Sequence, residues 1–431
     1  MFKRFPPKIT TSEALTAHQL AGLQWTVQHA FDYSSFYREH LTAAGITPGD
    51  ITCLDDLRRL PFTTAADLAA DYPFALRAAP FDDLVRIHAS SGTTGKRKVL
   101  CYTRKDIADW QDMFARCYEL AGLTCQDRVQ IAVGYGLWTA GIGFQQACEH
   151  FGALAVPVGP GNLELQTAFL IDLQSTVFCC TASMGLLLAE EVQRRGLRDK
   201  LNLKKIILGA ERSSAAMLDT MRHCLGIDEI YDITGLTELY GPGAGLSCRE
   251  DNGIHYWADY YILEVLNPLT LKPVAPGEIG EMVFTTLCKE GAPLIRYRSR
   301  DLTRLLEGPC PCGCMLPRHD RILGRSDDVV IFRGVNIYPG QIDEVLRQIP
   351  GIGSEYQLLL DHTPDGRDAM LVRVERSRNG GGPPDELLTR LIIGGIKHTM
   401  LVSCNVELLQ PGTLPRSEGK TKRVFDRRCF E

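Results

Sequence analysis

The stretch best suited to chemistry is Ser90-Ser91-Gly92-Thr93-Thr94-Gly95-Lys96, which combines hydroxyl groups, two glycines and a lysine. Glycines let a backbone approach a ligand closely, and hydroxyl and backbone N–H groups can donate to phosphate oxygens. It is not a GxxxxGK[ST] loop, because only two residues separate Gly92 from Gly95 and Arg97 stands where a magnesium-binding hydroxyl is needed. We therefore predict a triphosphate-binding loop of another nucleotide-binding class.

A second reactive stretch is Cys310-Pro311-Cys312-Gly313-Cys314, with Cys248 and His255 lying seven residues apart upstream. Thiols this close together in a turn suit a soft metal ion better than a strained local disulfide. The alternative is a loop of free thiols beside a chance histidine. The fifteen cysteines lack the short regular spacing of a secreted disulfide scaffold, so we expect most of them to be reduced.

Length and composition limit the class of protein. A chain of 431 residues that is 45% apolar can bury a large core, and its length predicts two domains. The net charge of −5 gives no overall attraction to nucleic acid or to an anionic membrane. Since no stretch resembles a membrane span or a signal peptide, we predict a cytoplasmic protein that binds neither nucleic acid nor a membrane.

Hydrophobic periodicity indicates the elements that position the glycine loop. Residues 12–45 predict a helix, and residues 85–89 predict a strand that leads into the loop. From there to about residue 240, valine- and isoleucine-rich strands alternate with helices, which is typical of an α/β arrangement with a largely parallel sheet. Ligands in such sheets collect at loops that follow strand ends. Three such loops are residues 134–143, 209–214 and 234–245.

The rest of the chain has a different pattern. Residues 255–305 predict strands separated by Asn-Pro and Pro-Gly turns, and residues 329–409 predict a compact mixture of strands and helices. The predicted fold class is therefore α/β, with a large N-terminal α/β domain that carries a β-rich subdomain and a small α+β C-terminal domain. The predicted domains are residues 1–326 and 327–431.

Four later segments form an ordered set of motifs with the glycine loop. They are Asp232-Ile233-Thr234-Gly235-Leu236-Thr237-Glu238, Tyr297-Arg298-Ser299-Arg300-Asp301, Gly324-Arg325-Ser326-Asp327-Asp328 with Arg333-Gly334-Val335-Asn336, and Pro415-Arg416-Ser417-Glu418-Gly419-Lys420. Together they resemble the adenylate-forming superfamily of acyl-CoA synthetases, and within it the phenylacetate-CoA ligase and coenzyme F390 synthetase-like group. The resemblance covers the chain from about residue 85 to its end.

The resemblance implies a role for each motif. Attack of an acid on the α-phosphate of ATP brings two anions together, so their charge must be neutralised. Glu238 is implied as the Mg2+ ligand, and Lys420 as the catalytic lysine that joins the carboxylate and the α-phosphate. Asp301 and Arg325 are implied to bind the ribose hydroxyls. The residues implied to bind ATP or CoA are Ser90, Ser91, Gly92, Thr93, Thr94, Gly95, Lys96, Glu211, Asp232, Ile233, Thr234, Thr237, Asp301, Arg325, Gly334, Val335 and Asn336.

Two further features follow from the resemblance. The C-terminal domain is implied to be mobile and to rotate between the half-reactions, with its hinge at Asp327 and with Gly334 to Asn336 facing CoA. Relatives usually carry a tyrosine at the position of Thr234, and its ring stacks on adenine. Tyr231 and Tyr240 are the candidates to replace that ring.

The segment from Gly134 to Gly141 is rich in glycine and contains two aromatic residues. The resemblance implies that this segment and Gly209 to Glu211 line the acyl pocket. Small residues leave room while flat rings flank it, which suits an aromatic acid; the alternative is that both rings are core residues. The implied substrate residues are Tyr135, Trp138, Ala140, Gly141, Gly209, Ala210 and Gly235.

The cysteine cluster also fits the resemblance, because some members of the group bind zinc with a comparable set of residues. The predicted ligands of a structural zinc ion are Cys248, His255, Cys310 and Cys312, with Cys314 in reserve.

The predicted function is that of an ATP-dependent aryl-acid:CoA ligase. Such an enzyme forms an acyl-adenylate with release of pyrophosphate, and then an acyl-CoA thioester with release of AMP. The expected partners are an aromatic carboxylic acid, ATP, Mg2+ and coenzyme A, and a homodimer is a further expectation. The alternatives are transfer of the acyl group to a carrier-protein thiol or an amine, transfer of AMP itself, and a non-enzymatic scaffold.

Overall fold

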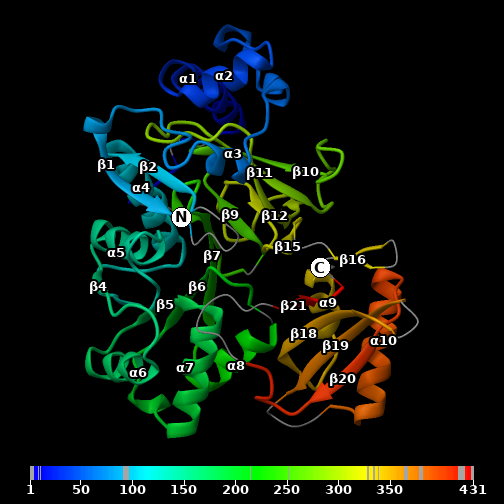
Figure 1. Cartoon of the computed structure of the whole chain (residues 1–431). Coiled ribbons are helices and arrows are strands. Elements are labelled where there is room, and N and C mark those ends of the chain that lie inside the picture. The colour runs from blue at the N-terminus through cyan, green and yellow to red at the C-terminus, as the bar shows by residue number, and fades with distance from the viewer. Residues whose placement is uncertain are drawn as a thin grey trace. The chain divides into compact units, whose positions relative to one another are not determined.

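The structure is a computed structural model of the chain, shown in Figure 1. It describes residues 4–7, 9, 11–90, 97–213, 215–250, 252–327, 330–332, 335–337, 339–363, 367–377, 382–415 and 423–428. Two compact units make up the chain. The first comprises Met1–Cys180, Lys200–Gly209 and Asp228–Arg321, and the second comprises Thr181–Asp199, Ala210–Ile227 and Ile322–Glu431. These units are defined by compactness alone, so the domain border after residue 326 stays a prediction.

Helices and strands alternate through the middle of the first unit, as the sequence predicts. Its helices are α1 (Ser12–Tyr33), α2 (Ser35–Ala43), α3 (Ala65–Ala70), α4 (Arg104–Leu120), α5 (Ala140–Phe151) and α6 (Leu163–Asp172). Its strands are β1 (Leu84–Ala89), β2 (Val99–Thr103), β3 (Arg128–Ile131), β4 (Leu154–Val156), β5 (Val177–Thr181), β6 (Lys205–Gly209), β7 (Glu229–Leu236), β8 (Gly241–Ser247), β9 (Ile254–Tyr256), β10 (Tyr261–Leu266), β11 (Gly280–Thr286), β12 (Tyr297–Thr303), β13 (Leu305–Leu306) and β14 (Arg318–His319).

The main sheet has the strand order β13-β14-β9-β8-β7-β6-β5-β3-β4. Strand β3 runs parallel to both β4 and β5, and β6 runs parallel to β7, whereas β8 and β9 continue the sheet in antiparallel pairing. All five residues of β5 are buried, as expected for a central strand covered on both faces. The predicted α/β class is confirmed, and the adjacent thiols of Cys179 and Cys180 are core residues.

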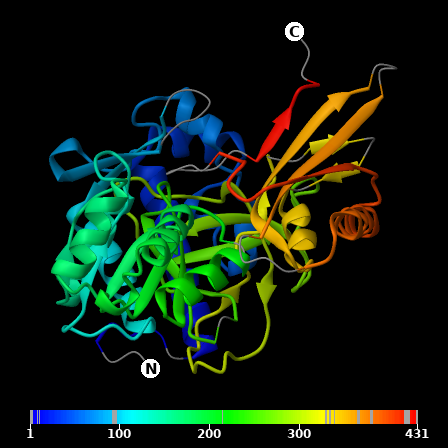
Figure 2. The same ribbon diagram turned by 90° about the horizontal axis from the view of Figure 1, so that it is seen from below.

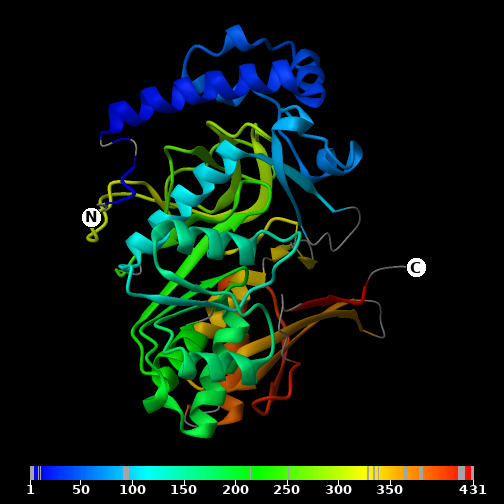
Figure 3. The ribbon, with the colours of Figure 1, turned by 90° about the vertical axis from the view of Figure 1, so that its left-hand side faces the viewer.

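The N-terminal helix is shorter than the sequence predicts. Residues 12–45 form two helices instead of one, because the chain is extended at Ser34, whose hydroxyl accepts the N–H of Tyr37 and caps α2. Helix α1 packs beside β11 (Figure 3). The Thr26 hydroxyl of α1 donates to the Thr286 carbonyl at 2.7 Å. Among the described residues, no helix has both the length and the apolarity required to cross a bilayer.

The second unit contains α7 (Ala182–Arg195), α8 (Ala215–Leu225), β15 (Gly324–Arg325), β16 (Val330–Phe332), β17 (Val335–Ile337), α9 (Pro339–Arg347), β18 (Ile352–His362), β19 (Asp368–Arg376), α10 (Asp385–Met400), β20 (Asn405–Leu409) and β21 (Val424–Asp426). Strands β18 and β19 pair antiparallel and form the long orange ribbon of Figure 2. Strands β21 and β20 pair parallel to them, one on each side.

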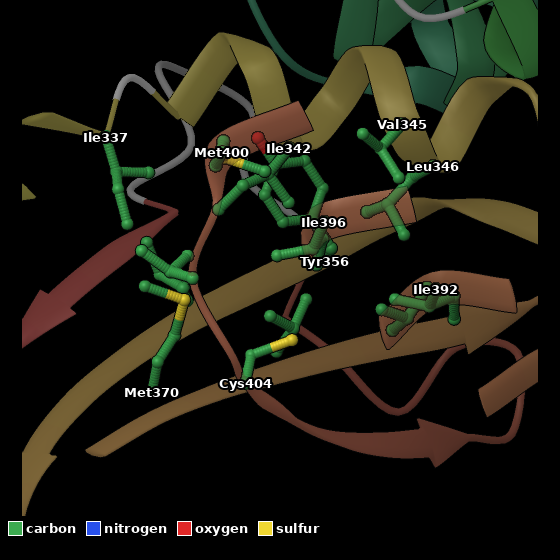
Figure 4. Packing of buried hydrophobic residues seen from close by; sticks show 14 of the residues in the cluster. Ile337, Ile342, Val345, Leu346, Tyr356, Met370, Ile392, Ile396, Met400 and Cys404 are labelled. Atoms are coloured by element: carbon green, nitrogen blue, oxygen red, sulfur yellow. The ribbon is translucent and has the colours of Figure 1, made fainter. Parts of the chain in front are cut away.

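The core of this α+β region lies between the sheet and helices α9 and α10 (Figure 4). Ile342 from α9 and Ile392 and Ile396 from α10 are fully buried, as are Leu358 and Val372 from the paired strands. Burial of an aliphatic side chain stabilises the folded state by about 1.5–3 kcal/mol relative to leaving it exposed. This cluster therefore gives the region a hydrophobic core of its own.

Candidate active site and metal centre

The predicted phosphate loop connects two strands of a hairpin. Strands β1 and β2 pair antiparallel with Ala89 opposite Val99, and the N–H of Ser90 donates to the carbonyl of Lys98 at 3.1 Å. Residues 91–96, which hold the other predicted loop residues, lie outside the described residues. The chain enters and leaves that segment at neighbouring points, so the loop is closed at its base by two strands.

Glu238 lies beside this base and binds a cationic side chain. Its Oε1 accepts hydrogen bonds from Nζ of Lys98, in an ion pair, and from the hydroxyl of Tyr297 at 2.9 Å. The carboxylate is buried, which opposes its ionisation, but the Lys98 ammonium and these hydrogen bonds outweigh burial and hold the pKa of Glu238 below its ordinary value. Carboxylate oxygens are ligands that Mg2+ prefers, so this ionised carboxylate can bind a divalent cation once Lys98 releases it.

Lys98 is a site residue that the sequence reasoning missed, because that reasoning assigned the loop's cation to Lys96. The available signal was the apolar run of residues 99–102 directly after Lys98, which is typical of a strand but was not identified as one. Tyr297 begins the Tyr297-to-Asp301 motif, so the structure brings this motif into contact with Glu238.

The predicted acyl-pocket segment contacts the Glu238 turn. The hydroxyl oxygens of Thr139 and Thr237 lie 3.3 Å apart, and both residues are buried. The segment predicted to bind the acid and the turn that carries Glu238, the predicted Mg2+ ligand, are therefore neighbours in the first unit.

Within this segment the aromatic rings pack on glycine backbone. A Cβ atom on Gly141 would lie 2.5 Å from the ring of Tyr135, and one on Gly134 would lie 3.0 Å from the ring of Trp138. The hydroxyl oxygen of Tyr135 is buried and meets no hydrogen-bond partner among the described residues, and burial raises the pKa of Tyr135 to about 12. This protonated hydroxyl has its donor unused and can serve a bound ligand. Ala140 begins α5 and is buried.

Gly209 and Gly235, at the ends of neighbouring strands β6 and β7, also have structural reasons to be glycine. A Cβ atom on Gly209 would lie 2.8 Å from the side chain of Ile233, and one on Gly235 would lie 2.0 Å from the Gly241 carbonyl oxygen. Ala210, a further predicted pocket residue, has a φ of +67°, in the left-handed region.

Three predicted nucleotide residues have defined local contacts. Asp301 follows Arg300, whose φ is +72°, and its N–H donates to the Ser299 hydroxyl at 3.0 Å. The N–H of Asp232 donates to the hydroxyl of Ser247 at 2.9 Å. In the second unit, Glu211 accepts hydrogen bonds from the N–H and the hydroxyl of Ser183 at 2.9 and 2.6 Å.

The predicted ribose residue Arg325 and the predicted hinge residue Asp327 are paired with each other. Nε and Nη2 of Arg325 donate to the two carboxylate oxygens of Asp327 at 2.8 and 2.9 Å. Both side chains are partly exposed, at 39% and 49%, so this pair is one that water screens.

Neither candidate to replace the adenine-stacking ring is exposed. Tyr231 is 2% exposed and donates to Glu229, and Tyr240 is 0% exposed. The structure thus offers neither ring to a ligand, and Thr234 remains a departure from the resembling family.

At the C-terminal end, Val335 and Asn336 lie in β17, opposite Phe332 and Ile331 of β16. Gly334 and the predicted catalytic residue Lys420 lie outside the described residues.

The four predicted metal ligands are gathered at one point. One ligand atom from each of Cys248, His255, Cys310 and Cys312 lies within 4.8 Å of the others. The Sγ atoms of Cys248 and Cys310 are 3.6 Å apart, and Sγ of Cys312 is 3.3 Å from Nε2 of His255. Tetrahedral zinc with bonds of about 2.3 Å to sulfur requires sulfur atoms about 3.8 Å apart, so the spacing fits.

Surrounding contacts favour the same ligand set. His255 is 0% exposed, and its Nδ1 lies 3.0 Å from the Leu316 carbonyl, which leaves Nε2 directed at the thiols. Cys314, the predicted reserve ligand, stands outside the group and contributes its backbone N–H to Sγ of Cys312 at 3.4 Å.

The chain is similar to known proteins along its whole length. Residues 19–288 match the family model of the AMP-binding enzymes, and residues 334–428 match that of the AMP-binding enzyme C-terminal domain. Phenylacetate-coenzyme A ligase of Pseudomonas putida is 39% identical over 98% of this chain and 96% of its own length. The enzyme of the same name from Thermus thermophilus is 39% identical over 98% of this chain and 99% of its own.

A solved structure agrees with these relatives. The structure of 2-hydroxyisobutyryl-CoA ligase in its postadenylation state, with an acyl-AMP bound, is 27% identical and superimposes with a TM-score of 0.85. The match covers 98% of this chain and 91% of that chain.

Proposed function

The chain belongs to the AMP-binding enzyme family as an ATP-dependent, AMP-forming acid–thiol ligase, and from this premise we propose that it joins phenylacetate, or a close aryl acid, to coenzyme A. The main observation that supports an adenylation site here is the buried contact of Glu238 with Lys98 and Tyr297 at the base of the glycine loop. The relatives' printed names support the choice of acid, and the rings of Tyr135 and Trp138 against glycine backbone are compatible with it.

In this proposal Glu238 holds Mg2+, which when bound neutralises phosphate charge and orients the triphosphate. Lys98 then exchanges its carboxylate partner for a phosphate oxygen, so that its ammonium remains paired in both states. Tyr297 keeps one hydrogen bond on the Glu238 carboxylate and fixes its direction throughout.

The acid is proposed to lie beside Tyr135, whose unused hydroxyl donor can bind a polar group of the ligand. Lys420 is proposed to contact the acid and the α-phosphate during adenylation, and rotation at Asp327 to remove it before CoA reacts. These two roles rest on the resemblance of the motifs.

Product analysis over a panel of acids tests the proposal. With ATP, Mg2+ and CoA, phenylacetate should give AMP and an aryl-CoA thioester, while matched aliphatic acids should give much less. Acid-dependent AMP formation without a CoA thioester would favour the alternative acceptors, a carrier-protein thiol or an amine. Thioester formation with aliphatic acids alone would contradict the aryl-acid proposal.

We also propose that Cys248, His255, Cys310 and Cys312 hold a structural zinc ion. They tie the turn at Cys310 to strand β9 of the main sheet through His255, which crosslinks segments far apart in sequence. Elemental analysis of purified protein should give about one equivalent of zinc per chain. Less than about half an equivalent would contradict the proposal.

A further inference from the structure

Lys289 is a fully buried lysine that the proposed chemistry does not use. It follows β11 and is 0% exposed. Moving an ammonium group out of water is costly, so a lysine is retained at such a position only where specific partners compensate it. An apolar residue of similar size would avoid this cost, and the partners of Lys289 therefore indicate what its ammonium group does.

The first partner is the backbone of Glu238. Nζ of Lys289 donates to the Glu238 carbonyl at 2.8 Å. The same ammonium lies 4.9 Å from the ring centroid of Tyr102 and 5.1 Å from that of Tyr240, both within the range of cation–π interactions. One carbonyl and two aromatic faces thus surround it.

The carbonyl that Lys289 binds belongs to an unusual turn. Residues 237–240 connect antiparallel strands β7 and β8, and the N–H groups of Leu239 and Tyr240 donate to the Leu236 carbonyl. Hairpin turns are normally exposed to water, yet all four residues here are buried. Their carbonyl groups therefore need donors from elsewhere in the protein.

Two side chains supply donors to three of these four carbonyl groups. The hydroxyl of Tyr102 lies 3.0 Å from both the Thr237 and the Tyr240 carbonyl oxygens, and shares its proton between them. Lys289 supplies a donor to the carbonyl of Glu238 itself. The backbone that carries the Glu238 carboxylate is held by these two residues.

Asp106 supplies the nearby negative charge. Its carboxylate accepts the N–H groups of Glu290 and Gly291 at 2.7 and 2.8 Å, so it also anchors the segment that carries Lys289. Asp106 and Glu238 both attract this ammonium group, which offsets part of the cost of burying it.

We propose that Lys289 is a positioning residue for the metal site, which fixes the Glu238 backbone so that its carboxylate faces the metal–triphosphate complex. This rests on the proposed role of Glu238 as the metal ligand. The side chain of Glu238 is oriented by Lys98 and Tyr297, and its main chain by Lys289. Loss of Lys289 should therefore weaken metal binding before it affects the acid pocket or the second half-reaction.

The test compares Lys289→Met and Lys289→Gln with a matched control, Lys105→Met. Lys105 also donates to a backbone carbonyl, that of Cys288 at 3.0 Å, but its side chain is 45% exposed and its ion pair is with Asp109 of the same helix, α4. Binding of Mn2+ at the protein, measured at excess ATP by the enhancement of the water-proton relaxation rate that the protein adds to the Mn2+–ATP signal, reports the site without turnover. Acid-dependent pyrophosphate exchange, titrated with Mg2+, reports the same site during adenylation.

Lys289→Met should raise the metal concentration for half-saturation by about tenfold in both measurements, as expected for loss of a buried charged hydrogen bond. Lys289→Gln, which keeps a donor, should lie between that value and wild type, and Lys105→Met should match wild type. Thioester formation from supplied acyl-AMP should stay within about twofold in every folded variant, because it bypasses the metal–triphosphate step.

An unchanged metal half-saturation in Lys289→Met would overturn the proposal, and so would equal losses in both half-reactions. Failure of both Lys289 variants to fold would also overturn it, since the residue would then be required for folding alone. If wild-type protein binds Mn2+ and ATP but shows no exchange with aryl acids, the proposed substrate is wrong while the role of Lys289 is still tested by Mn2+ binding.

Discussion

Replacing Lys98 with methionine leaves the buried Glu238 carboxylate without its cation. Loss of one partner of a buried ion pair costs about 3–5 kcal/mol, because the other charge remains desolvated. The side chain of Lys98 is 25% exposed and that of Glu238 is 7% exposed. Water therefore screens part of the interaction, and we expect about 3 kcal/mol, the lower end of that range.

The pH dependence of this loss identifies its cause. In the wild type, the pKa of Glu238 lies below its ordinary value of 4.5, so the stabilisation is present above that pH and is lost as the pH falls through the lowered pKa. In Lys98→Met, burial without the ammonium group raises the pKa of Glu238. The buried carboxylate then destabilises the folded state at neutral pH, and this destabilisation disappears as Glu238 is protonated. The difference in stability between the two proteins should therefore shrink on acidification.

Urea titrations near pH 7.5 and about pH 5, followed through the first cooperative transition, measure this difference. A second variant, Lys98→Met with Glu238→Gln, removes the stranded charge and should recover at least half of the loss at the higher pH. A loss that is the same at both pH values, or a double variant no more stable than Lys98→Met, would refute the ion-pair reasoning.

Three other substitutions test separate parts of the site. Cys310→Ser should lower bound zinc below about half an equivalent and lower the melting temperature. After a chelator has removed the metal from both proteins, the variant and the wild type should melt at the same temperature. Gly141→Ala places a Cβ 2.5 Å from the Tyr135 ring, so the KM for the acid should rise about tenfold while the KM for ATP changes little; an unchanged acid KM would remove Tyr135 from the pocket. Lys420→Ala should abolish pyrophosphate exchange yet largely spare thioester formation from supplied acyl-AMP, and equal loss of both steps would contradict domain rotation.

Local patterns in the sequence predicted most elements of the fold. The alternation of apolar strands and helices between residues 127 and 240 predicted the parallel part of the main sheet, because buried parallel strands need nearly continuous apolar runs such as that of β5. The break between α1 and α2 was missed, because one capping serine in an otherwise helical pattern is too local to change the periodicity.

The site was predicted less completely. The four metal-ligand candidates were found because thiols and imidazole are few and chemically specific, and the structure brings them together. Lys98 and Lys289 were missed because their roles depend on contacts between distant segments: Lys98 with Glu238, and Lys289 with the turn between β7 and β8. A lysine in a sequence predicts an exposed residue, and only tertiary packing shows that it is buried.

Pyrophosphate exchange is the measurement that tests the central claim most directly. Purified wild-type protein should exchange labelled pyrophosphate into ATP only when phenylacetate or a close aryl acid and Mg2+ are both present. Glu238→Gln, which is nearly isosteric, should reduce exchange by at least about a hundredfold while the protein stays folded. Exchange that proceeds without any acid, or that survives in Glu238→Gln at the wild-type rate, would contradict an acid-activating site built around this carboxylate.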